Sequence, residues 1–181
     1  MVFWYLTEIK TWVILIAMTQ TFFISPVYKE TAQCLDNRRL NKNITEAFQV
    51  FRWCIGVGKM QGNKHPYHMW NGYEESLLEY IVEMHLEWNK RFDTGLRGGV
   101  RTHKNGLEAT EILSRIDASR YPKPYWINDE RVLSSQRSAL LYKDFEWYSK
   151  FGWKEQPAIP TKISKKGVVS LPYFWPDMEV V

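Results

Sequence analysis

The chain has 181 residues, of which 45% are hydrophobic and 24% are charged, and this composition is typical of one globular domain with a real core. The formal net charge of +4 permits a polyanionic partner. It excludes a purely electrostatic nucleic-acid binder, because such proteins carry a much larger excess of Lys and Arg. Any contact with DNA is therefore expected from local clusters of cations.

The first 17 residues are an apolar extension that Glu8 and Lys10 interrupt. Its longest uncharged run, residues 11–17, is too short to span a membrane, and no basic region or A-x-A site marks a secretory signal. The sequence Met18-Thr19-Gln20 resembles a fresh start, so we expect translation to begin at Met18 and residues 18–181 to form one domain.

The first half of the chain is predicted to be helical. A short helix is expected over residues 28–36, and a longer one over residues 37–57, where apolar residues recur at steps of three and four. After a polar turn, His65-Pro66 is suited to opening a helix. From Trp70 to Trp88 the apolar residues keep helical spacing for five turns, so this is expected to be one continuous helix.

The second half contains more turns. Residues 91–106 hold four glycines and four Lys or Arg, which predicts a mobile basic loop. Helices are expected over residues 107–116 and from Asn128 to about Tyr148, and the proline-rich tail from residue 157 to 181 is expected to be extended. No alternating run is long enough for a sheet. We therefore predict an all-α fold, a compact single-domain helical bundle with an extended C-terminal tail.

One face of the helix over residues 37–57 carries chemistry-bearing side chains. On a helical wheel Arg39, Lys42, Glu46 and Trp53 fall together, opposite the apolar stripe. Cations beside a carboxylate favour its ionised form, and the same cations suit a phosphate backbone. The alternative interpretation is a solvated helix face with ordinary ion pairs between residues four apart.

Three further patterns either leave alternatives open or do not indicate a functional site. Gln136 and Arg137 fall inside the apolar stripe of the last helix, so they either satisfy an internal carboxylate or point into a cleft. His65 and His68 lack the further ligands that a metal site needs, and we expect neither a metal nor a cofactor. Cys34 and Cys54 have no metal-type spacing and are expected to be core residues of a protein in the reducing cytoplasm.

Several motifs resemble the pyrimidine-dimer DNA glycosylase/AP lyase family of the endonuclease V type, and in particular its broader bacterial and viral branch. The first is Leu35-Asp36-x-x-x-Leu40-x-x-x-x-x-Glu46-Ala47. The others follow in order along the chain: Thr21-Phe22, Arg39-Leu40-x-Lys42, Asn63-x-His65-Pro66, Met69-Trp70-x-Gly72-Tyr73-Glu74, Arg137-Ser138-x-Leu140-Leu141-x-Lys143-Asp144 and Pro172-Tyr173-x-Trp175-Pro176. Each motif is short, and their common order carries the resemblance.

The resemblance implies an all-helical DNA repair enzyme that removes a damaged pyrimidine and then cuts the backbone by β-elimination. It assigns the catalytic carboxylate to Glu46. The amine that attacks the sugar in this family is the α-amino group exposed when the initiator Met is removed, which would be that of Thr19. Its reference pKa is near 8, against about 10.4 for Lys. Lys42, one turn before Glu46, is the alternative amine.

DNA is the expected partner of a monomeric protein. The side chains expected to contact it are those of Arg38, Arg39, His65, Gln136, Arg137 and Lys143. At position 136 the broader branch has His, and Gln cannot carry protons between groups as His does. Two other functions stay open: a DNA-binding module that keeps the fold without the reaction, and a helical protein attached to a membrane through residues 1–17.

Overall fold

The computed structural model describes residues 20–92, 103–165 and 167–176. The apolar extension over residues 1–17, the expected start at Met18 and the expected nucleophile at Thr19 lie outside these residues, and so does most of the predicted basic loop. None of the helices in the described residues is both long and apolar enough to cross a membrane.

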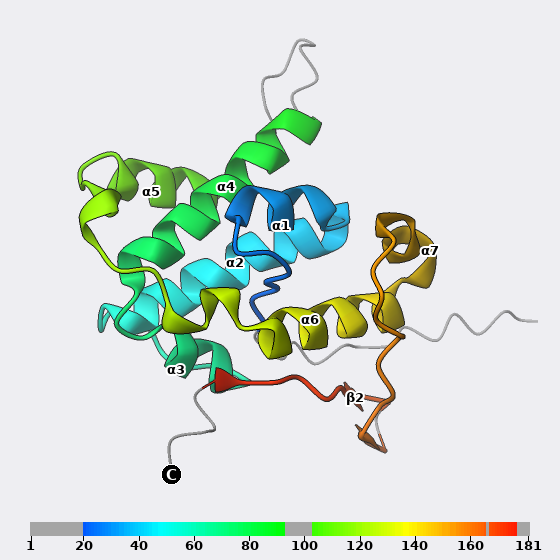
Figure 1. Cartoon of the computed structure of the whole chain (residues 1–181). Coiled ribbons are helices and arrows are strands. Elements are labelled where there is room, and N and C mark those ends of the chain that lie inside the picture. Colours follow the sequence, from blue (N-terminus) through cyan, green and yellow to red (C-terminus); the bar gives the residue numbers. More distant parts are fainter. Residues whose placement is uncertain (1–19, 93–102, 166, 177–181) are drawn as a thin grey trace, which may run out of the picture.

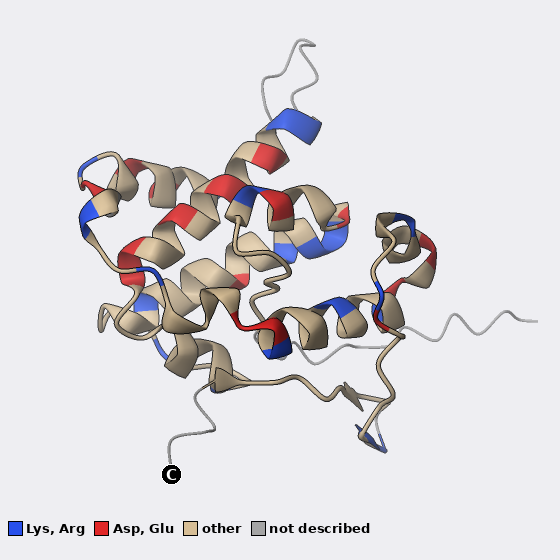
Figure 2. Ribbon diagram, in the orientation of Figure 1, with Lys and Arg blue, Asp and Glu red and all other residues tan. Residues whose placement is uncertain are grey.

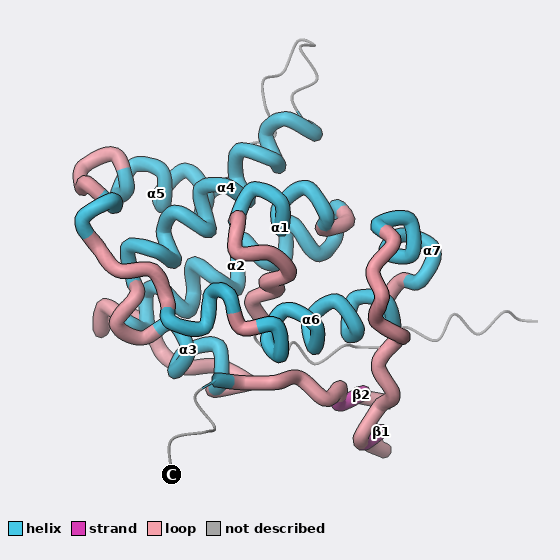
Figure 3. Tube along the Cα trace, in the orientation of Figure 1, coloured by secondary structure: helices cyan, strands magenta, loops and turns pink. Residues whose placement is uncertain are grey.

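The fold is all-α, as predicted from the sequence (Figures 1 and 3). The α-helices are α1 (Tyr28–Cys34), α2 (Asn37–Cys54), α3 (His65–Trp70), α4 (Glu74–Phe92), α5 (Lys104–Leu113), α6 (Glu130–Lys143) and α7 (Phe145–Tyr148). Short 3-10 helices cover Ala118–Arg120, Tyr125–Asn128 and Ser149–Phe151. The tail adds one correction to the sequence prediction, a minimal antiparallel pair of strands, β1 (Lys162–Ile163) and β2 (Val169–Ser170).

The core lies where α2 and α4 pack together, with α1 and α5 against α4 and α3 against α2. Its centre is a cluster of aromatic rings in edge-to-face or tilted contact, which holds Phe23, Tyr28, Trp70, Tyr80 and Trp126. The buried indole nitrogens are paired: Trp70 donates to the hydroxyl of Thr21 at 3.0 Å, and Trp126 to the carbonyl of Met69 at 2.9 Å. Much of the high aromatic content therefore fills the core.

Two helices predicted to be continuous are broken. The helix expected from Trp70 to Trp88 is interrupted, because α3 ends at Trp70 and α4 begins at Glu74. Between them Gly72 has a φ of +85°, and its N–H donates to the Glu74 carboxylate at 2.8 Å. The last helix likewise stops at Lys143. Asp144 adopts an extended φ of −162° and its side chain caps α7 by accepting from the N–H of Trp147.

The helix α5 begins earlier than predicted and includes Gly106, which we expected in the loop. Glycine in a helix normally lowers its stability, so its presence needs a packing reason. A Cβ added at Gly106 would lie 2.6 Å from Cδ2 and 2.8 Å from Cβ of the buried His85 on α4. The prediction that Gly106 lies in the loop was wrong, because this glycine allows α5 to pack closely against α4.

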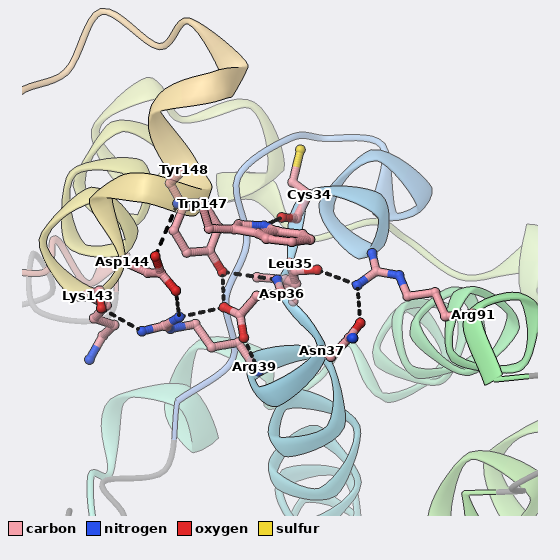
Figure 4. A network of polar contacts seen from close by, with 10 residues as sticks. All are labelled: Cys34, Leu35, Asp36, Asn37, Arg39, Arg91, Lys143, Asp144, Trp147 and Tyr148. Carbon is pink, nitrogen blue, oxygen red and sulfur yellow. Dashed lines mark hydrogen bonds and ion pairs between the residues drawn. The ribbon is translucent and has the colours of Figure 1, made fainter.

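A polar network joins the start of α2 to the end of α6 and to α7 (Figure 4). Asp36 caps α2 by accepting from the N–H of Arg39 at 3.0 Å, and its second oxygen accepts from the Tyr148 hydroxyl at 2.7 Å. The Arg39 guanidinium pairs with Asp36 and donates to the carbonyl of Lys143 at 3.0 Å. This network fixes where α6 ends relative to α2.

On the other side of Asp36, Arg91 of α4 satisfies the free carbonyls at the end of α1 (Figure 4). It donates to the carbonyls of Ala32, Gln33 and Leu35 at 3.1, 3.0 and 2.6 Å, and Glu87 holds its Nε at 2.7 Å. A cation at a helix C-terminus is favourable, because it binds carbonyls that have no partner within the helix.

Asp36→Asn should destabilise the protein by about 2–4 kcal/mol, because the new amide would face two donors, Tyr148 and Arg39, in a nearly buried site. Burial opposes ionisation of Asp36, but hydrogen bonds from Tyr148 and Arg39 outweigh it and lower its pKa. Because its pKa is lower in the folded protein, ionised Asp36 stabilises the fold at pH values above its unfolded-state pKa of about 3.9. This contribution to the free energy of unfolding is lost as the pH falls through the pKa of Asp36 in the folded protein. Urea unfolding at several pH values measures the difference.

The matched control is Asp117→Asn, which removes an exposed carboxylate that contacts only Ser119 and Arg120 beside it. We expect no measurable change in the free energy of unfolding of this variant. Equal stability of Asp36→Asn and the wild type at pH 7, or a difference that does not shrink below about pH 4, would contradict the assigned role of Asp36.

Candidate active site

The N-terminal segment (residues 20–25) is nearly buried and runs extended between α2 and α6 (Figure 1). Alternate backbone N–H groups in it donate to side chains: Gln20 to the Glu46 carboxylate at 3.1 Å, Phe22 to the Asn43 amide oxygen at 3.0 Å, and Ile24 to the Thr31 hydroxyl at 3.3 Å. Buried backbone donors need partners, and no strand lies beside this segment in the described residues to supply them. Glu46 and Asn43 of α2 therefore position the segment.

The other side of the segment is fastened to α6. The side-chain amide of Gln20 donates to that of Gln136 at 3.0 Å, and Arg137 donates to the carbonyl of Ile24 at 3.1 Å. Arg137 also pairs with the largely buried carboxylate of Glu155 and with the exposed carboxylate of Glu130, so one of its two partners is internal. The segment thus connects α6 to α2 through side chains that the sequence pattern marked as anomalous.

Glu46 is buried, with 6% of the residue exposed, so the alternative interpretation of a solvated helix face is wrong for this residue. One carboxylate oxygen accepts from Gln20, and the other lies 3.3 Å from the Lys42 ammonium. Burial raises the pKa of Glu46, although Lys42, the Gln20 N–H and Lys143 act in the opposite direction. A carboxyl group with a raised pKa exchanges protons closer to neutral pH, which suits general acid–base chemistry.

A pocket of about 270 Å³ is lined by both residues that contact the Glu46 carboxylate, Gln20 and Lys42, although Glu46 itself does not line it. We call it the tail pocket because residues 168–171, Tyr173 and Trp175 form one of its walls. The N-terminal segment contributes Gln20 and Phe22, α2 contributes Lys42, and α6 contributes Lys143. The C-terminal segment crosses from β2 to α3, where Trp175 stacks on His65 with ring centroids 5.3 Å apart (Figure 1). The pocket therefore combines amines, aromatic rings and polar backbone.

Lys42 and Lys143 line the tail pocket, and Figure 2 shows further cations at the start of α2. In α2 Glu46 is the one acidic residue, and four cations accompany it: Arg38, Arg39, Lys42 and Arg52. Although Lys143 is exposed, partial loss of hydration beside the pocket and the cations Arg39, Lys42 and Arg38 lower its pKa to about 8, while Glu46 opposes this change. An amine with such a pKa is partly neutral near physiological pH, so the pocket has nucleophilic as well as electrostatic character.

The residues expected to contact DNA are not all in one place. Lys143 and His65 line the tail pocket, and Arg38 is exposed on α2. Arg39 is engaged with Asp36 and Lys143 in the network of Figure 4. Gln136 is fully buried beneath Gln20 and does not reach solvent, and Arg137 is 14% exposed and paired with two carboxylates.

Sequence reasoning missed three contributors to the site. Asn43 binds the backbone of Phe22, and a signal for it existed, because it is a polar residue beside the apolar stripe of α2. Tyr173 and Trp175 line the tail pocket; they lay inside a motif of the family resemblance, but nothing in the tail pattern predicted that this segment returns to α3. In the described residues no group of three or more His, Cys, Asp or Glu is placed to hold a metal ion.

Comparison with known proteins agrees with the resemblance. The family model described as pyrimidine dimer DNA glycosylase matches residues 19–95, which cover the N-terminal segment, α1 to α4 and Glu46. Searches of curated proteins and of solved structures found no match. The match implies DNA glycosylase and repair chemistry, and DNA as the substrate fits it. Over residues 19–95, which are fewer than half of the chain, the sequence is therefore similar to the pyrimidine dimer DNA glycosylase family.

Proposed function

We propose that the protein is a DNA N-glycosylase with AP-lyase activity that acts on damaged pyrimidines. Glu46 is its catalytic carboxylate, and the α-amino group of Thr19 is its nucleophile in the form that begins after Met18. The hydrogen bond from the Gln20 N–H to Glu46, at 3.1 Å, carries this proposal, because Gln20 directly follows Thr19 in the chain.

Covalent geometry supports the pairing of this amine with Glu46. The backbone nitrogens of consecutive residues are less than about 4 Å apart whatever the torsion angles. An α-amino group at residue 19 would therefore lie within about 7 Å of the Glu46 carboxylate. A deoxyribose C1′ between the two groups would be within reach of both.

The first chemical step removes the base. The neutral amine attacks C1′, the bond from C1′ to the base nitrogen breaks, and the base leaves with the electron pair and takes up a proton. Positive charge develops on the sugar as this bond breaks, and the ionised Glu46 stabilises it. Glu46 then accepts the proton that the attacking nitrogen loses.

The second step cuts the strand. The sugar ring opens at the bond from C1′ to O4′, O4′ takes a proton, and a Schiff base remains on C1′. Removal of a proton from C2′ by Glu46 forms a double bond between C2′ and C3′ and expels the 3′ phosphate. The raised pKa of Glu46 suits these successive proton transfers.

The charge distribution supports binding of a DNA backbone near the tail pocket. Arg38 is exposed, and Lys42 and Lys143 line the pocket, so phosphates flanking a target nucleotide would meet cations. His65, Arg137 and Arg39 remain proposed contacts, whereas the fully buried Gln136 could contact DNA only if Gln20 moved away from it. Arg39 and Arg137 would have to give up internal partners to bind phosphate, so we assign them first to holding α6 in place.

Glu46→Gln should lower base release and nicking at least about 100-fold on a duplex with one pyrimidine dimer, because the variant cannot stabilise the sugar cation or accept protons. DNA affinity should stay equal or rise, since a negative charge is removed from a basic site. The melting temperature at pH 7 should not fall, because burial favours the neutral form of Glu46 and Gln can still accept from Gln20.

Glu108→Gln is the matched control, since it removes one charge from an exposed position on α5. We expect wild-type activity from it. Unchanged base release in Glu46→Gln would refute the catalytic assignment. A wild type that binds the duplex but releases no base would instead favour the DNA-binding module, and pelleting of the full chain with lipid vesicles would favour membrane attachment.

A form that starts at Met18, with Met removed so that intact mass shows Thr19 first, should crosslink to DNA containing an abasic site when borohydride is present. The reductant converts the Schiff base into a stable secondary amine. Peptide mapping should place the adduct on the Thr19 nitrogen, because an α-amino group has a reference pKa near 8 and is more often neutral than Lys.

The full chain is the control for this experiment, because its residue 19 carries an amide nitrogen that cannot form a Schiff base. No adduct on the N-terminal peptide should form from it. An adduct of the Met18-start form that maps to Lys42 would instead make Lys42 the nucleophile.

A further inference from the structure

Lys143 is the last residue of α6 and lines the tail pocket together with Lys42 and Gln20. Its ammonium lies 6.0 Å from the centroid of the Phe22 ring, which lines the same pocket. The neighbouring Gln20 donates its N–H to Glu46. Lys143 and the proposed catalytic carboxylate therefore belong to one site, although they lie on different helices.

The two pocket lysines differ in their partners. Lys42 is held by Glu46 at 3.3 Å. The side-chain nitrogen of Lys143 has neither a carboxylate within ion-pair distance nor a hydrogen-bond acceptor among residues 20–92, 103–165 and 167–176. An amine in an ion pair is occupied as an ammonium donor, whereas Lys143 loses no such partner when it becomes neutral.

The backbone of Lys143 is fixed where this nitrogen is needed. Arg39 donates to its carbonyl at 3.0 Å, and Asp36 and Tyr148 hold Arg39 and the start of α2 in turn (Figure 4). In the same view the Lys143 side chain points away from this network. A fixed backbone with an unpaired terminal amine is the arrangement that a lysine nucleophile requires.

Electrostatics favours the neutral amine. Lys143 is exposed at the end of α6, and partial loss of hydration beside the pocket wall, together with the neighbouring cations, lowers its pKa to about 8. At pH 7.5 an ordinary lysine with a pKa near 10.4 is neutral in only about one molecule in a thousand. A pKa near 8 increases the neutral population by about two orders of magnitude.

We propose that Lys143 is a second amine nucleophile of this site, which forms a Schiff base with the ring-opened deoxyribose of an abasic site. The inference rests on the proposed function only in that it uses the same pocket and Glu46. In the full chain the nitrogen of residue 19 is an internal amide, and Lys143 would allow this form to cleave the strand. The substrate is an aldehyde flanked by phosphates, and no base has to be removed first.

The reaction balances as follows. The Lys143 nitrogen bonds to C1′ of the open sugar, and the aldehyde oxygen leaves as water, so an imine remains. Glu46 takes a proton from C2′, a double bond forms between C2′ and C3′, and the 3′ phosphate leaves with the electron pair. Hydrolysis of the imine by water returns the amine and releases the unsaturated aldehyde.

The test uses the full 181-residue chain, duplex DNA with a preformed abasic site and cyanoborohydride, followed by peptide mapping of the crosslinked product. We expect the adduct on Lys143, and Lys143→Arg should lower trapping at least tenfold while retaining the positive charge. Lys150→Arg is the matched control, because Lys150 is an exposed lysine stacked on Trp147, and it should trap like the wild type.

An adduct on Met1, Lys42 or another lysine, or no adduct at all, would overturn the proposal. These results are separable from failure of the proposed function, which is read from base release on dimer-containing DNA by the Met18-start form. Abasic DNA requires no base release, so the trapping experiment tests the role of Lys143 independently of the base-release assay.

A second measurement needs no DNA and no variant. Competitive labelling of the wild type with an amine-reactive reagent, read by peptide mass across pH, should give Lys143 a midpoint near 8. A midpoint near that of an ordinary lysine would contradict the proposal. Groups that face Lys143 and titrate or carry charge must be tracked in the same series: Arg38, Arg39, Lys42, Glu46, His65, Tyr173 and Asp144.

Discussion

Three backbone N–H groups of the N-terminal segment bind side chains that project from α1 and α2, and the rest of the structure depends on this contact. The segment has no strand beside it in the described residues, so Glu46, Asn43 and Thr31 take the place of a neighbouring strand. It also carries α6, through Gln20 and Ile24. The carboxylate proposed for catalysis is thus also the one that holds position 20 in place.

This dual use explains the character of the site. A carboxylate that accepts a backbone N–H inside the protein has a fixed orientation, and its burial raises its pKa. The cations around Glu46 favour its ionised form, and they also form a basic surface that extends toward solvent. Two amines of different origin, one terminal and one on α6, are proposed to serve the same sugar carbon. Position and charge are the properties that the proposed chemistry uses.

The sequence predicted those parts of this account that depend on local spacing. The helix over residues 37–57, its apolar stripe and the placing of Glu46 beside Lys42 follow from a period of 3.6 residues, and the family followed from short motifs. The burial of Glu46 did not, because the segment that covers it lies 26 residues away in the chain. Gln136 was assigned to a DNA surface for the same reason: its contact with Gln20 joins residues 116 positions apart.

The most direct test of this account is the response of one amide proton. In an ¹⁵N-labelled protein the Gln20 amide should exchange slowly with solvent, and its proton shift should follow the titration of a carboxyl group with a midpoint above 4.5. Glu46→Gln should abolish that titration and leave the amide protected. Fast exchange of Gln20, or a shift that does not respond to ionisation of Glu46, would contradict the contact on which the site is built.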